Sequence, residues 1–384
     1  MSSYLDETAS QARFCHVLDN CTPNPLLFNS IEFSDREKFD YRIVTLRADA
    51  GLTEQMAEIG IPVRSLGYTS RKNAFGALLK LYSIFRKERI EIVQTHLMDA
   101  SLIGLMAARL ARVPVTIFTG HHSSETPLYH RKLLTFVDGS CGRFLAKHTI
   151  APSKQMRDVF VRDLKVPERK ISVLYHGFDL DGWREKARQT NNFRREFDID
   201  DKIVLGAVGR LYRLKNFENL IKGFAKAAAD RSDVVLAIAG AGDRSGLQRL
   251  VDSLGITDEV FLVGSRTDIA SVMQSFDVLV HPSLAESFGM IFIEAFALGK
   301  PILTTKVGVA PEIIVDGENG FLMEDGEPDS IADGITKILA SKERWKIMGD
   351  NGIAVTERFE VRKTQAVCDE AYLQWLRKDS RYFG

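Results

Sequence analysis

Hydrophobic and polar positions alternate along this chain in two patterns. Short apolar runs recur through almost the whole sequence, and the segments between them carry apolar residues at the spacing of an amphipathic helix, as at Phe75, Leu78, Leu79, Tyr82 and Phe85. In the first half, the runs predict buried strands at Phe14–Leu18, Tyr41–Thr45, Pro62–Ser65, Ile92–Thr95, Val115–Thr119, Thr149–Ala151 and Ile171–Leu174. Strands that alternate with helices are typical of α/β architecture with parallel sheets.

A second series of the same kind begins at Val204. Its predicted strands are Val204–Val208, Val234–Ala239, Glu259–Val263, Val278–Val280, Pro301–Thr305 and Gly320–Met323. Between the two series, residues 184–201 read REKARQTNNFRREFDIDD, which is polar and shows no buried-strand pattern. We therefore predict an N-terminal α/β domain over residues 1–185, a linker over 186–200 and a C-terminal α/β domain over 201–357.

The end of the chain predicts a terminal helix over residues 358–384. Its apolar and aromatic side chains, among them Phe359, Tyr372 and Trp375, need a partner surface, and we expect the helix to cross back to the N-terminal domain. The length agrees with two domains, because 384 residues exceed what a single hydrophobic core usually holds.

Composition narrows the classes of protein. Lys and Arg together number 51, as do Asp and Glu, so the formal net charge is zero and bulk attraction to nucleic acid is not expected. Four scattered cysteines lack the spacing of a metal site and are expected to be reduced and mostly buried. The polar start of the chain and the lack of a long apolar run predict a cytoplasmic protein without a bilayer-spanning helix.

The segment 71–89, RKNAFGALLKLYSIFRKER, is both basic and amphipathic. Such a helix can lie on an anionic membrane, which would place the protein peripherally at the inner face of the membrane. The commoner role of such a segment is to cover a sheet with its apolar face while the basic side is solvated. Both readings stay open at this point.

The most informative stretch for function is HPSLAESFGMIFIEAFALGKP, residues 281–301. It follows a predicted buried strand and continues into a helix that ends near Gly299 and Pro301. Glu286 precedes this helix and Glu294 lies on its second turn, while Phe288, Gly289 and Met290 are expected in its first turn. Because the first N–H groups of a helix are unpaired, its start at the carboxyl end of a parallel strand is suited to an anion.

The first strand of the second series leads into GRLYRLKN, residues 209–216. Arg210 and Lys215 flank the predicted turn, so that a bidentate guanidinium and a mobile ammonium could converge on one pair of phosphates. A leaving nucleoside diphosphate gains negative charge, which fixed cations or a metal must stabilise.

Together these two segments resemble the retaining glycosyltransferases of family four, which have the GT-B fold. Members share a G-R-L-x-x-x-K motif and an E-x7-E motif with Phe-Gly after the first Glu. The resemblance extends over most of the second domain, through Gly240-Ala241-Gly242, Phe261–Gly264 and Glu312, and more loosely into THLMDASLIG and PVTIFTGHH of the first domain. It implies two Rossmann-like domains whose parallel sheets face each other across a central cleft.

The resemblance also implies a role for each matching residue in the second domain. Arg210 and Lys215 would hold the donor diphosphate, Glu286 the donor sugar and Glu294 the ribose hydroxyls. Phe288, Gly289 and Met290 would meet the sugar and the distal phosphate through their backbone, and Val263 and Gly264 would line the base pocket. Glu286, Arg210 and Lys215, with a histidine of the first domain, are the implied catalytic set.

That histidine belongs to the doublet His121 and His122, which follows the strand Val115–Thr119. Family members place one histidine here, facing the donor from the opposite wall; the count from Pro114 matches His121, and His122 remains an alternative on the acceptor side. His96 also follows a strand end and could contact the acceptor, although a packed supporting histidine is an equal alternative.

The loop after the first strand departs from the family. Residues 19–25, DNCTPNP, contain no glycine, and the two prolines lack the N–H groups that a phosphate-binding turn offers. The contact of this loop with the donor is therefore in question, and side chains such as Asn20 could serve the acceptor instead.

The expected function is transfer of a hexosyl unit from a nucleotide-diphosphate sugar to a hydroxyl of a glycan or lipid-linked acceptor, with retention of anomeric configuration. No metal or other cofactor is expected, because Asp179-Leu180-Asp181 and Asp198-Ile199-Asp200 read as turn formers rather than as metal ligands. A nucleotide-sugar 2-epimerase of the same fold and a non-catalytic nucleotide-sugar-binding protein are the alternatives. A dinucleotide-binding dehydrogenase is disfavoured, because Gly240-Ala241-Gly242 lacks a third glycine at the required spacing.

Overall fold

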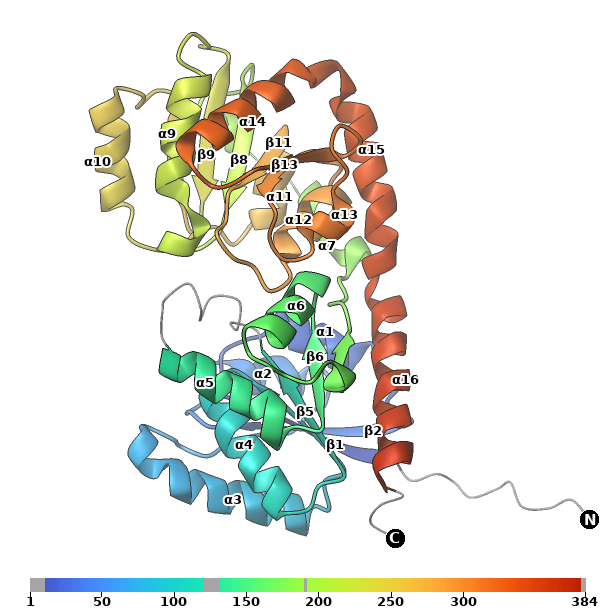
Figure 1. Ribbon diagram of the computed structural model, residues 1–384. Helices are drawn as coiled ribbons and strands as arrows, with labels where there is room; N and C mark the ends of the chain where they lie inside the picture. Colours follow the sequence, from blue (N-terminus) through green and yellow to red (C-terminus); the bar gives the residue numbers. More distant parts are fainter. Residues whose placement is uncertain (1–10, 121–131, 190–191, 381–384) are drawn as a thin grey trace, which may run out of the picture. The chain divides into compact units, whose positions relative to one another are not determined.

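A computed structural model describes residues 11–120, 132–189 and 192–380 of the chain (Figure 1). These residues form two compact units. The first unit comprises residues 1–177 together with 361–384, and the second comprises residues 178–360. Each unit contains one parallel sheet covered by helices on both faces, so the predicted α/β class is confirmed.

The first unit is built on a seven-stranded sheet with the order β3-β2-β1-β4-β5-β6-β7. All its described strand pairs are parallel. The strands are β1 (Ala12–Leu18), β2 (Phe39–Thr45), β3 (Val63–Ser65), β4 (Ile92–His96), β5 (Val115–Thr119), β6 (His148–Ala151) and β7 (Ile171–Val173). Because β1 lies between β2 and β4, the loop after β1 lies at the centre of the carboxyl edge of the sheet.

The helices of the first unit follow its strands in chain order. They are α1 (Pro25–Glu32), α2 (Leu52–Ala57), η1 (Arg71–Asn73), α3 (Ala74–Lys87), α4 (Met98–Leu110), α5 (Lys132–Ser140), η2 (Cys141–Leu145), α6 (Lys154–Arg162), η3 (Glu168–Lys170) and α16 (Val361–Ser380). Polar side chains cap some of these helices: Asn24 accepts from the N–H of Leu27, and Ser153 accepts from the N–H of Met156.

The second unit has a six-stranded sheet with the order β10-β9-β8-β11-β12-β13. Its strands are β8 (Ile203–Val208), β9 (Val234–Ala239), β10 (Val260–Gly264), β11 (Val278–His281), β12 (Ile302–Thr305) and β13 (Gly320–Met323). Its helices are α7 (Leu180–Arg188), α8 (Phe193–Glu196), η4 (Arg213–Lys215), α9 (Phe217–Ala227), α10 (Ser245–Leu254), α11 (Ile269–Gln274), α12 (Met290–Ala297), α13 (Ala310–Ile313), α14 (Pro328–Ala340), η5 (Lys342–Arg344), α15 (Trp345–Thr356) and η6 (Glu357–Phe359).

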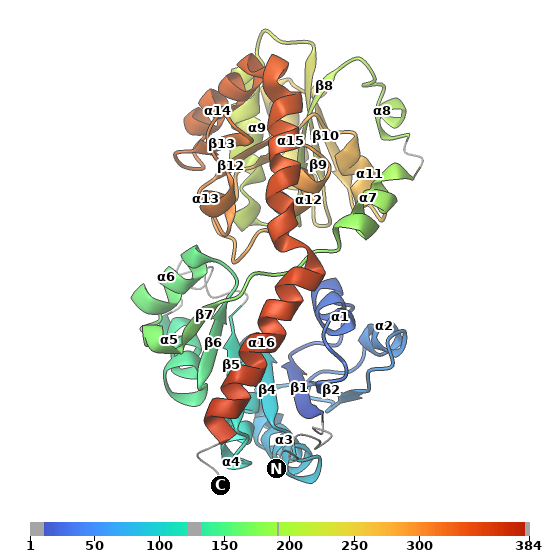
Figure 2. The same cartoon turned by 90° about the vertical axis from the view of Figure 1, so that its right-hand side faces the viewer.

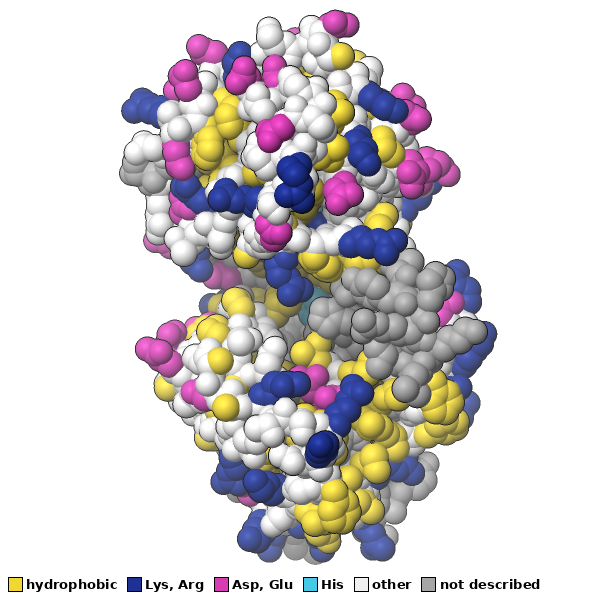
Figure 3. Space-filling view, turned by 90° about the vertical axis from the view of Figure 1, so that its left-hand side faces the viewer, with side chains coloured by type: hydrophobic (Ala, Val, Ile, Leu, Met, Phe, Trp, Pro, Cys, Tyr) yellow, Lys and Arg dark blue, Asp and Glu magenta, His cyan; other side chains and the backbone are white. Residues whose placement is uncertain are grey.

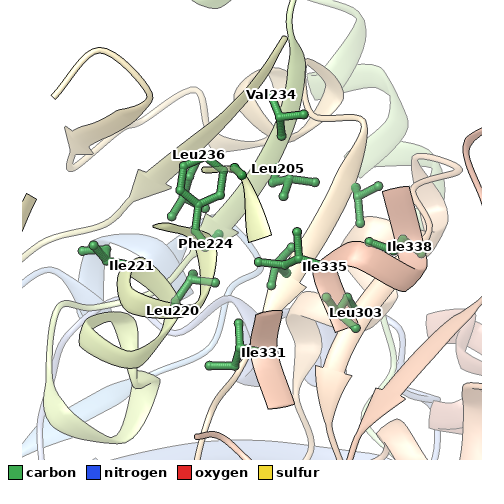
Figure 4. Packing of buried hydrophobic residues seen from close by; sticks show 14 of the residues in the cluster. Leu205, Leu220, Ile221, Phe224, Val234, Leu236, Leu303, Ile331, Ile335 and Ile338 are labelled. Atoms are coloured by element: carbon green, nitrogen blue, oxygen red, sulfur yellow. The ribbon is translucent and has the colours of Figure 1, made fainter. Parts of the chain in front are cut away.

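The core of the second unit explains why its strands read as continuous apolar runs. Both faces of the sheet are covered, so that Val234–Ala239 is buried at every position. On one face, α9 and α14 pack against each other and against the strands, and Phe224 and Ile335 are buried among them (Figure 4). Fully burying one such side chain stabilises a fold by roughly 1.5–3 kcal/mol.

The terminal helix α16 belongs to the first unit and runs across its sheet (Figure 2). Tyr372 packs edge-on against Phe14 of β1, and its hydroxyl lies 3.3 Å from Oε1 of Gln94. The Asp369 carboxylate accepts hydrogen bonds from the Ser34 hydroxyl at 3.0 Å and from the backbone N–H of Asp35 at 2.8 Å. These contacts supply the partner surface that the aromatic residues of this segment required.

The division between the units differs from the predicted domain boundaries. The first unit ends at Gly177 rather than at residue 185, and the predicted linker 186–200 lies within the second unit. This segment includes the end of α7 and all of α8, and Phe193 of α8 is fully buried. Its many charged residues lie on the surface of short helices, which is why the segment looked like a linker.

Free thiols are found at the four cysteine positions, three of them buried, as predicted.

Candidate active site

Two loops meet at the carboxyl edge of the second sheet, because β8 and β11 are neighbours there. The GRLYRLKN segment follows β8, and the HPSLAES segment follows β11. Backbone and side chains join them: the N–H of Leu284 and the hydroxyl of Ser283 both donate to the carbonyl of Leu214, at 2.8 and 3.0 Å. Asn216 Nδ2 donates to the carbonyl of Pro282 at 3.2 Å. The structure thus makes one connected site from two motifs that lie far apart in the sequence.

An ion pair joins the same two loops. Nζ of Lys215 forms a short salt bridge with Oε1 of Glu286, and both side chains are largely shielded from solvent. Nε2 of His281 lies 2.8 Å from the same carboxylate oxygen. His281 is fully buried at the end of β11, and its hydrogen bond positions the carboxylate of Glu286.

Burial and these two neighbours set the ionisation of the group. Burial disfavours a charged carboxylate, but the hydrogen bond from His281 and the positive charge of Lys215 outweigh it and lower the pKa of Glu286 to about 2. Burial lowers the pKa of His281, so its imidazole is neutral near pH 7. Because the carboxylate can only accept, the Nε2 atom carries the proton, and Nδ1 has no hydrogen-bond partner among the described residues.

The helix α12 begins at Met290, so the prediction that Phe288 and Gly289 lie in its first turn is wrong. Gly289 is the N-cap residue, with left-handed backbone angles of φ 90° and ψ 63°. A Cβ atom there would lie 2.4 Å from Cε2 of Phe292, so both the backbone angle and the space favour glycine. The first N–H groups of the helix therefore start two residues later than predicted, and that of Phe292 donates to the Gly289 carbonyl at 3.1 Å.

A second glycine supports this loop, and the sequence analysis did not single it out. Gly308 follows β12, and a Cβ atom on it would lie 2.3 Å from the carbonyl oxygen of Phe288 and 3.0 Å from Cβ of Glu286. The next residue, Val309, donates its N–H to the Phe288 carbonyl at 2.8 Å. The glycine in the KVGVAPE segment after a predicted strand was the signal that could have identified this contact.

Glu294 lies on α12, inside the unit but not fully covered. Burial raises its pKa to about 7, opposed by the positive charge of Lys215. The backbone carbonyl of Glu294 accepts a hydrogen bond from the indole N–H of Trp183 at 3.1 Å, which fixes this turn of the helix to α7. The two glutamates therefore differ: Glu286 is strongly ionised and Glu294 titrates near neutrality.

Arg210 is exposed and carries its guanidinium above the ring of Tyr212, 5.2 Å from the centroid. Lys215 instead lies with its aliphatic stem against Gly209, where a Cβ atom would meet it at 3.3 Å. The two cations start from the same turn, and only Lys215 is paired with Glu286 in the described structure.

The carboxyl end of β10 lies on the other side of β9 from these loops. The pairing of β10 with β9 shifts register between Leu262 and Gly264, and Gly264 has a positive φ of 83°. Arg244 lies against this strand end: its Nη1 donates to the Leu262 carbonyl at 2.8 Å and would be 3.3 Å from a Cβ atom on Gly264. Val263 and Gly264 are partly exposed here, and Arg244 is a neighbouring cation that the sequence analysis missed.

In the first unit, Asn20 and His96 line one cavity of about 300 Å³ at the carboxyl ends of β1 and β4. Residues of α16, among them Thr364 and Gln365, line the same cavity. Nε2 of His96 lies 3.1 Å from Nδ1 of His16, which is buried in β1. Burial lowers the pKa of His16 to about 3, so this ring is neutral and acts as a hydrogen-bonding support for His96.

Side chains of the glycine-free loop 19–25 make hydrogen bonds that stabilise the helices around it. Asp19 accepts from the N–H of Ala100 at the start of α4, and Asn24 caps α1. Asn20 and Thr22 are exposed and line the cavity, and the Thr22 hydroxyl donates to Oδ1 of Asn20 at 3.4 Å. His121 and His122 lie outside the described residues.

Two family models match adjacent parts of the chain. Residues 31–181 match the model described as Glycosyltransferase Family 4, and residues 189–355 match the model described as Glycosyl transferases group 1. The chain belongs to the GT-B glycosyltransferases of family four. The two models meet near the division between the two units of the structure.

Individual relatives agree with this assignment. The capsular polysaccharide biosynthesis glycosyltransferase CapM of Staphylococcus aureus is 29% identical over 343 residues, covering 88% of this chain and 90% of CapM. A UDP-Gal:α-D-GlcNAc-diphosphoundecaprenol α-1,3-galactosyltransferase of Escherichia coli is 25% identical over 279 residues, covering 69% of this chain and 70% of that enzyme.

Solved structures show the same fold. HepE of Anabaena, crystallised with UDP, superposes with a TM-score of 0.80 and 21% identity over 94% of this chain and 100% of the HepE chain. Its complex with UDP-glucose gives a TM-score of 0.81. At this level of identity the likeness establishes the GT-B fold, and the family membership of this glycosyltransferase comes from the sequence comparisons.

Proposed function

We propose that this glycosyltransferase transfers a hexosyl unit from a nucleotide-diphosphate sugar to a hydroxyl of a glycan or lipid-linked acceptor, with retention and without a metal ion. The observation that carries the proposal is the junction of the two motif loops, where Lys215, Glu286 and the start of α12 meet. A cation, a fixed acceptor and the N-terminus of a helix at one strand edge match the needs of a sugar diphosphate.

Each group takes a role from its position. Lys215 and Arg210 stabilise the negative charge that builds on the leaving diphosphate. Glu286, held by His281, accepts hydrogen bonds from donor sugar hydroxyls, and the backbone of Phe288, Gly289 and Met290 meets the sugar and the distal phosphate.

The nucleoside part of the donor is assigned to the other end of the site. Glu294 accepts from the ribose hydroxyls, and Val263 and Gly264 line the base pocket. The UDP complexes of HepE and the name of the galactosyltransferase relative support a nucleotide-sugar donor.

The acceptor is assigned to the first unit. The cavity beside Asn20 and His96 has polar groups at its mouth and apolar residues such as Leu27 and Leu174 along its wall. That combination suits a hydroxyl-bearing acceptor with an apolar portion. The relatives named for capsular polysaccharide and for a diphosphoundecaprenol substrate support a role in polysaccharide or glycoconjugate synthesis.

The route without a metal rests on the assignment of the acidic residues. Asp179 caps α7 by accepting from the N–H of Gly182 at 3.0 Å, and Asp198 adopts a left-handed turn conformation with φ 53°. Both therefore have local structural tasks. Retention would follow from a front-face reaction in which the leaving phosphate accepts the acceptor proton, so that the protein supplies position and charge.

The experiment is a transfer assay with a panel of radiolabelled nucleotide sugars and glycan or lipid-linked acceptors, with and without a chelator. The expected result is acceptor-dependent transfer of one sugar with retained configuration, unchanged by the chelator. NMR of the donor with enzyme alone completes the test. Accumulation of a C2 epimer without acceptor would show that the enzyme is an epimerase and would contradict the transferase proposal. Loss of activity in the chelator that Mg²⁺ restores would contradict the metal-free route.

A further inference from the structure

Large exposed hydrophobic side chains are concentrated on one set of helices in the first unit. Among the described residues, seven of the twelve lie there: Phe75, Leu79 and Tyr82 on α3, Met106 and Leu110 on α4, Phe136 on α5 and Phe144 on η2. Phe75 has a relative exposure of 72% and Phe144 of 63%. In the second unit, single exposed residues such as Leu254 and Ile347 lie on separate helices. We call these seven residues the α3–η2 surface; Val367, which also belongs to the first unit, lies on α16.

The three residues of α3 form a single stripe. Phe75, Leu79 and Tyr82 are spaced four and three positions apart, so they share one helix face, and Arg86 continues the stripe. The opposite face of α3 is buried through residues such as Leu81 and Phe85. This helix therefore covers the sheet with one apolar face, as the commoner reading of the segment 71–89 expected, and presents a second apolar stripe outward.

The other residues of the surface are held beside α3. Helix α4 packs against α3, α5 and η2. The Arg143 guanidinium lies 5.6 Å from the ring centroid of Phe136 and 5.2 Å from that of Phe144. Nη1 of Arg109 donates to the carbonyl of Phe144 at 2.8 Å. Exposed aromatic rings are thus fixed in place by arginines.

The charge of these elements is strongly one-sided. Residues 71–87 contain five basic and no acidic side chains. Of the acids on the adjoining helices, Asp99 forms a salt bridge with exposed Arg71, one of these five basic residues, and Asp138 is only 6% exposed. Figure 3 shows hydrophobic and basic side chains beside one another on this part of the first unit.

We propose that the α3–η2 surface docks on an anionic lipid bilayer. Apolar rings surrounded by Lys and Arg match the boundary between acyl chains and negatively charged headgroups. A second copy of the chain fits this surface less well, because the basic side chains of one copy would meet those of the other. Within the described ranges, no helix is long and apolar enough to cross a membrane, so the contact is a peripheral one.

Docking would bring the first unit to a membrane that carries a lipid-linked acceptor. The binding itself concerns this surface alone and is independent of the donor chemistry proposed above. It can therefore be tested without donor or acceptor, and its failure would leave the transferase proposal standing.

The experiment measures sedimentation of the full chain with vesicles of phosphatidylcholine, with and without phosphatidylglycerol. Binding is expected only to the anionic vesicles and is expected to weaken with salt. Phe75→Ala/Leu79→Ala and Arg86→Gln/Lys87→Gln should each reduce partitioning by about tenfold or more. The matched controls in the second unit, Leu254→Ala/Ile347→Ala and Lys222→Gln/Lys346→Gln, should change it by less than about twofold.

Thermal melting of each variant shows whether it is folded, and analytical ultracentrifugation shows whether it self-associates. Equal partitioning of the α3 variants and the controls would overturn the proposal, as would failure of the wild-type chain to bind anionic vesicles. Vesicle-independent dimers that the α3 substitutions dissociate would identify the surface as a contact between copies and would also overturn it.

Discussion

The ammonium of Lys215 and the carboxylate of Glu286 form a salt bridge between the loop after β8 and the loop after β11. Glu286 receives a second hydrogen bond from buried His281. Lys215, the residue proposed to bind the diphosphate, and Glu286, the residue proposed to bind the sugar, are thus held together before any donor binds. In the proposed reaction, this preorganisation would favour catalysis, because the charged groups need little rearrangement as the leaving group develops its charge.

Removing the Lys215 ammonium should slow transfer more than it weakens the fold. Lys215→Ala is expected to reduce kcat/KM by ~10²-fold or more, because one fixed cation is lost from the leaving diphosphate. Arg210→Ala should act in the same direction. Arg213→Ala is the matched control, since Arg213 is an exposed basic residue of the same turn. Steady-state transfer rates check this, and near-wild-type rates for both Lys215 and Arg210 variants would refute the diphosphate assignment.

Glu286 and His281 should be separable from nucleotide binding. Glu286→Gln is expected to lower turnover by ~10²-fold while the Kd of the nucleotide diphosphate changes by less than about threefold, because the carboxylate is assigned to the sugar. His281→Gln should retain more activity than His281→Ala, since an amide can still donate to Glu286. Calorimetric titration and transfer assays measure the two effects. A similar loss in nucleotide affinity and in turnover would show that Glu286 does not act on the sugar alone.

The raised pKa of Glu294 predicts a pH-dependent donor affinity. Because we propose that the ionised carboxylate accepts hydrogen bonds from the ribose hydroxyls, affinity should rise as the pH passes upward through about 7. Glu294→Gln should flatten the profile of nucleotide Kd against pH. The sign for stability is opposite: the folded chain holds this proton more tightly than the unfolded chain, so that contribution is present at low pH and lost as pH rises through about 7. A profile that Glu294→Gln leaves unchanged would assign the titration to another group.

Gly240 should be essential to the position of the Arg210 turn. A Cβ atom on Gly240 would lie 1.8 Å from the carbonyl oxygen of Gly209, so Gly240→Ala must displace the backbone that carries Arg210. We expect a loss of about 1–3 kcal/mol in the free energy of unfolding, with weaker donor binding.

Gly246→Ala is the control, because nothing lies within 4 Å of a Cβ atom there. Gly246 is on α10, where alanine should raise stability by up to about 1 kcal/mol. Urea unfolding measures both. Equal free energies of unfolding for the two variants would mean that the backbone at Gly209 can shift to accept the Cβ atom without loss of stability.

Asp369 should anchor α16 to the first unit. Asp369→Ala removes the acceptor for Ser34 and for the N–H of Asp35, and should cost about 1–3 kcal/mol in the free energy of unfolding. Glu370→Ala is the neighbouring control, because Glu370 is exposed and bonds to Gln374 and Arg377 on its own helix. Thermal and urea unfolding compare them, and an equal effect of the two substitutions would show that the Asp369 contacts are dispensable.

Local pattern was enough for much of the fold. Apolar runs such as Val234–Ala239 coincide with strands because both faces of the sheets are covered. Every position of such a run is buried, so every position is apolar. The boundaries of domains and helices were harder to predict from the sequence where they depend on tertiary packing. The segment 186–200 looked like a linker from its charge, yet it contains buried side chains, and fully buried Phe193 holds α8 in the second unit. Helix α12 starts at Met290, because Gly289 adopts a left-handed cap that only its surroundings make evident.

For the site, the sequence by itself determined which chemical groups are available: Arg210 and Lys215 in one motif, Glu286 and Glu294 in another. Only the tertiary structure decided that Lys215 pairs with Glu286, that Gly308 supports the Phe288 carbonyl and that His281 fixes the carboxylate. The reason is the strand order. β8 pairs with β9 and β11, so loops distant along the chain become hydrogen-bonded neighbours, and periodicity along a sequence contains no information on which strands will pair.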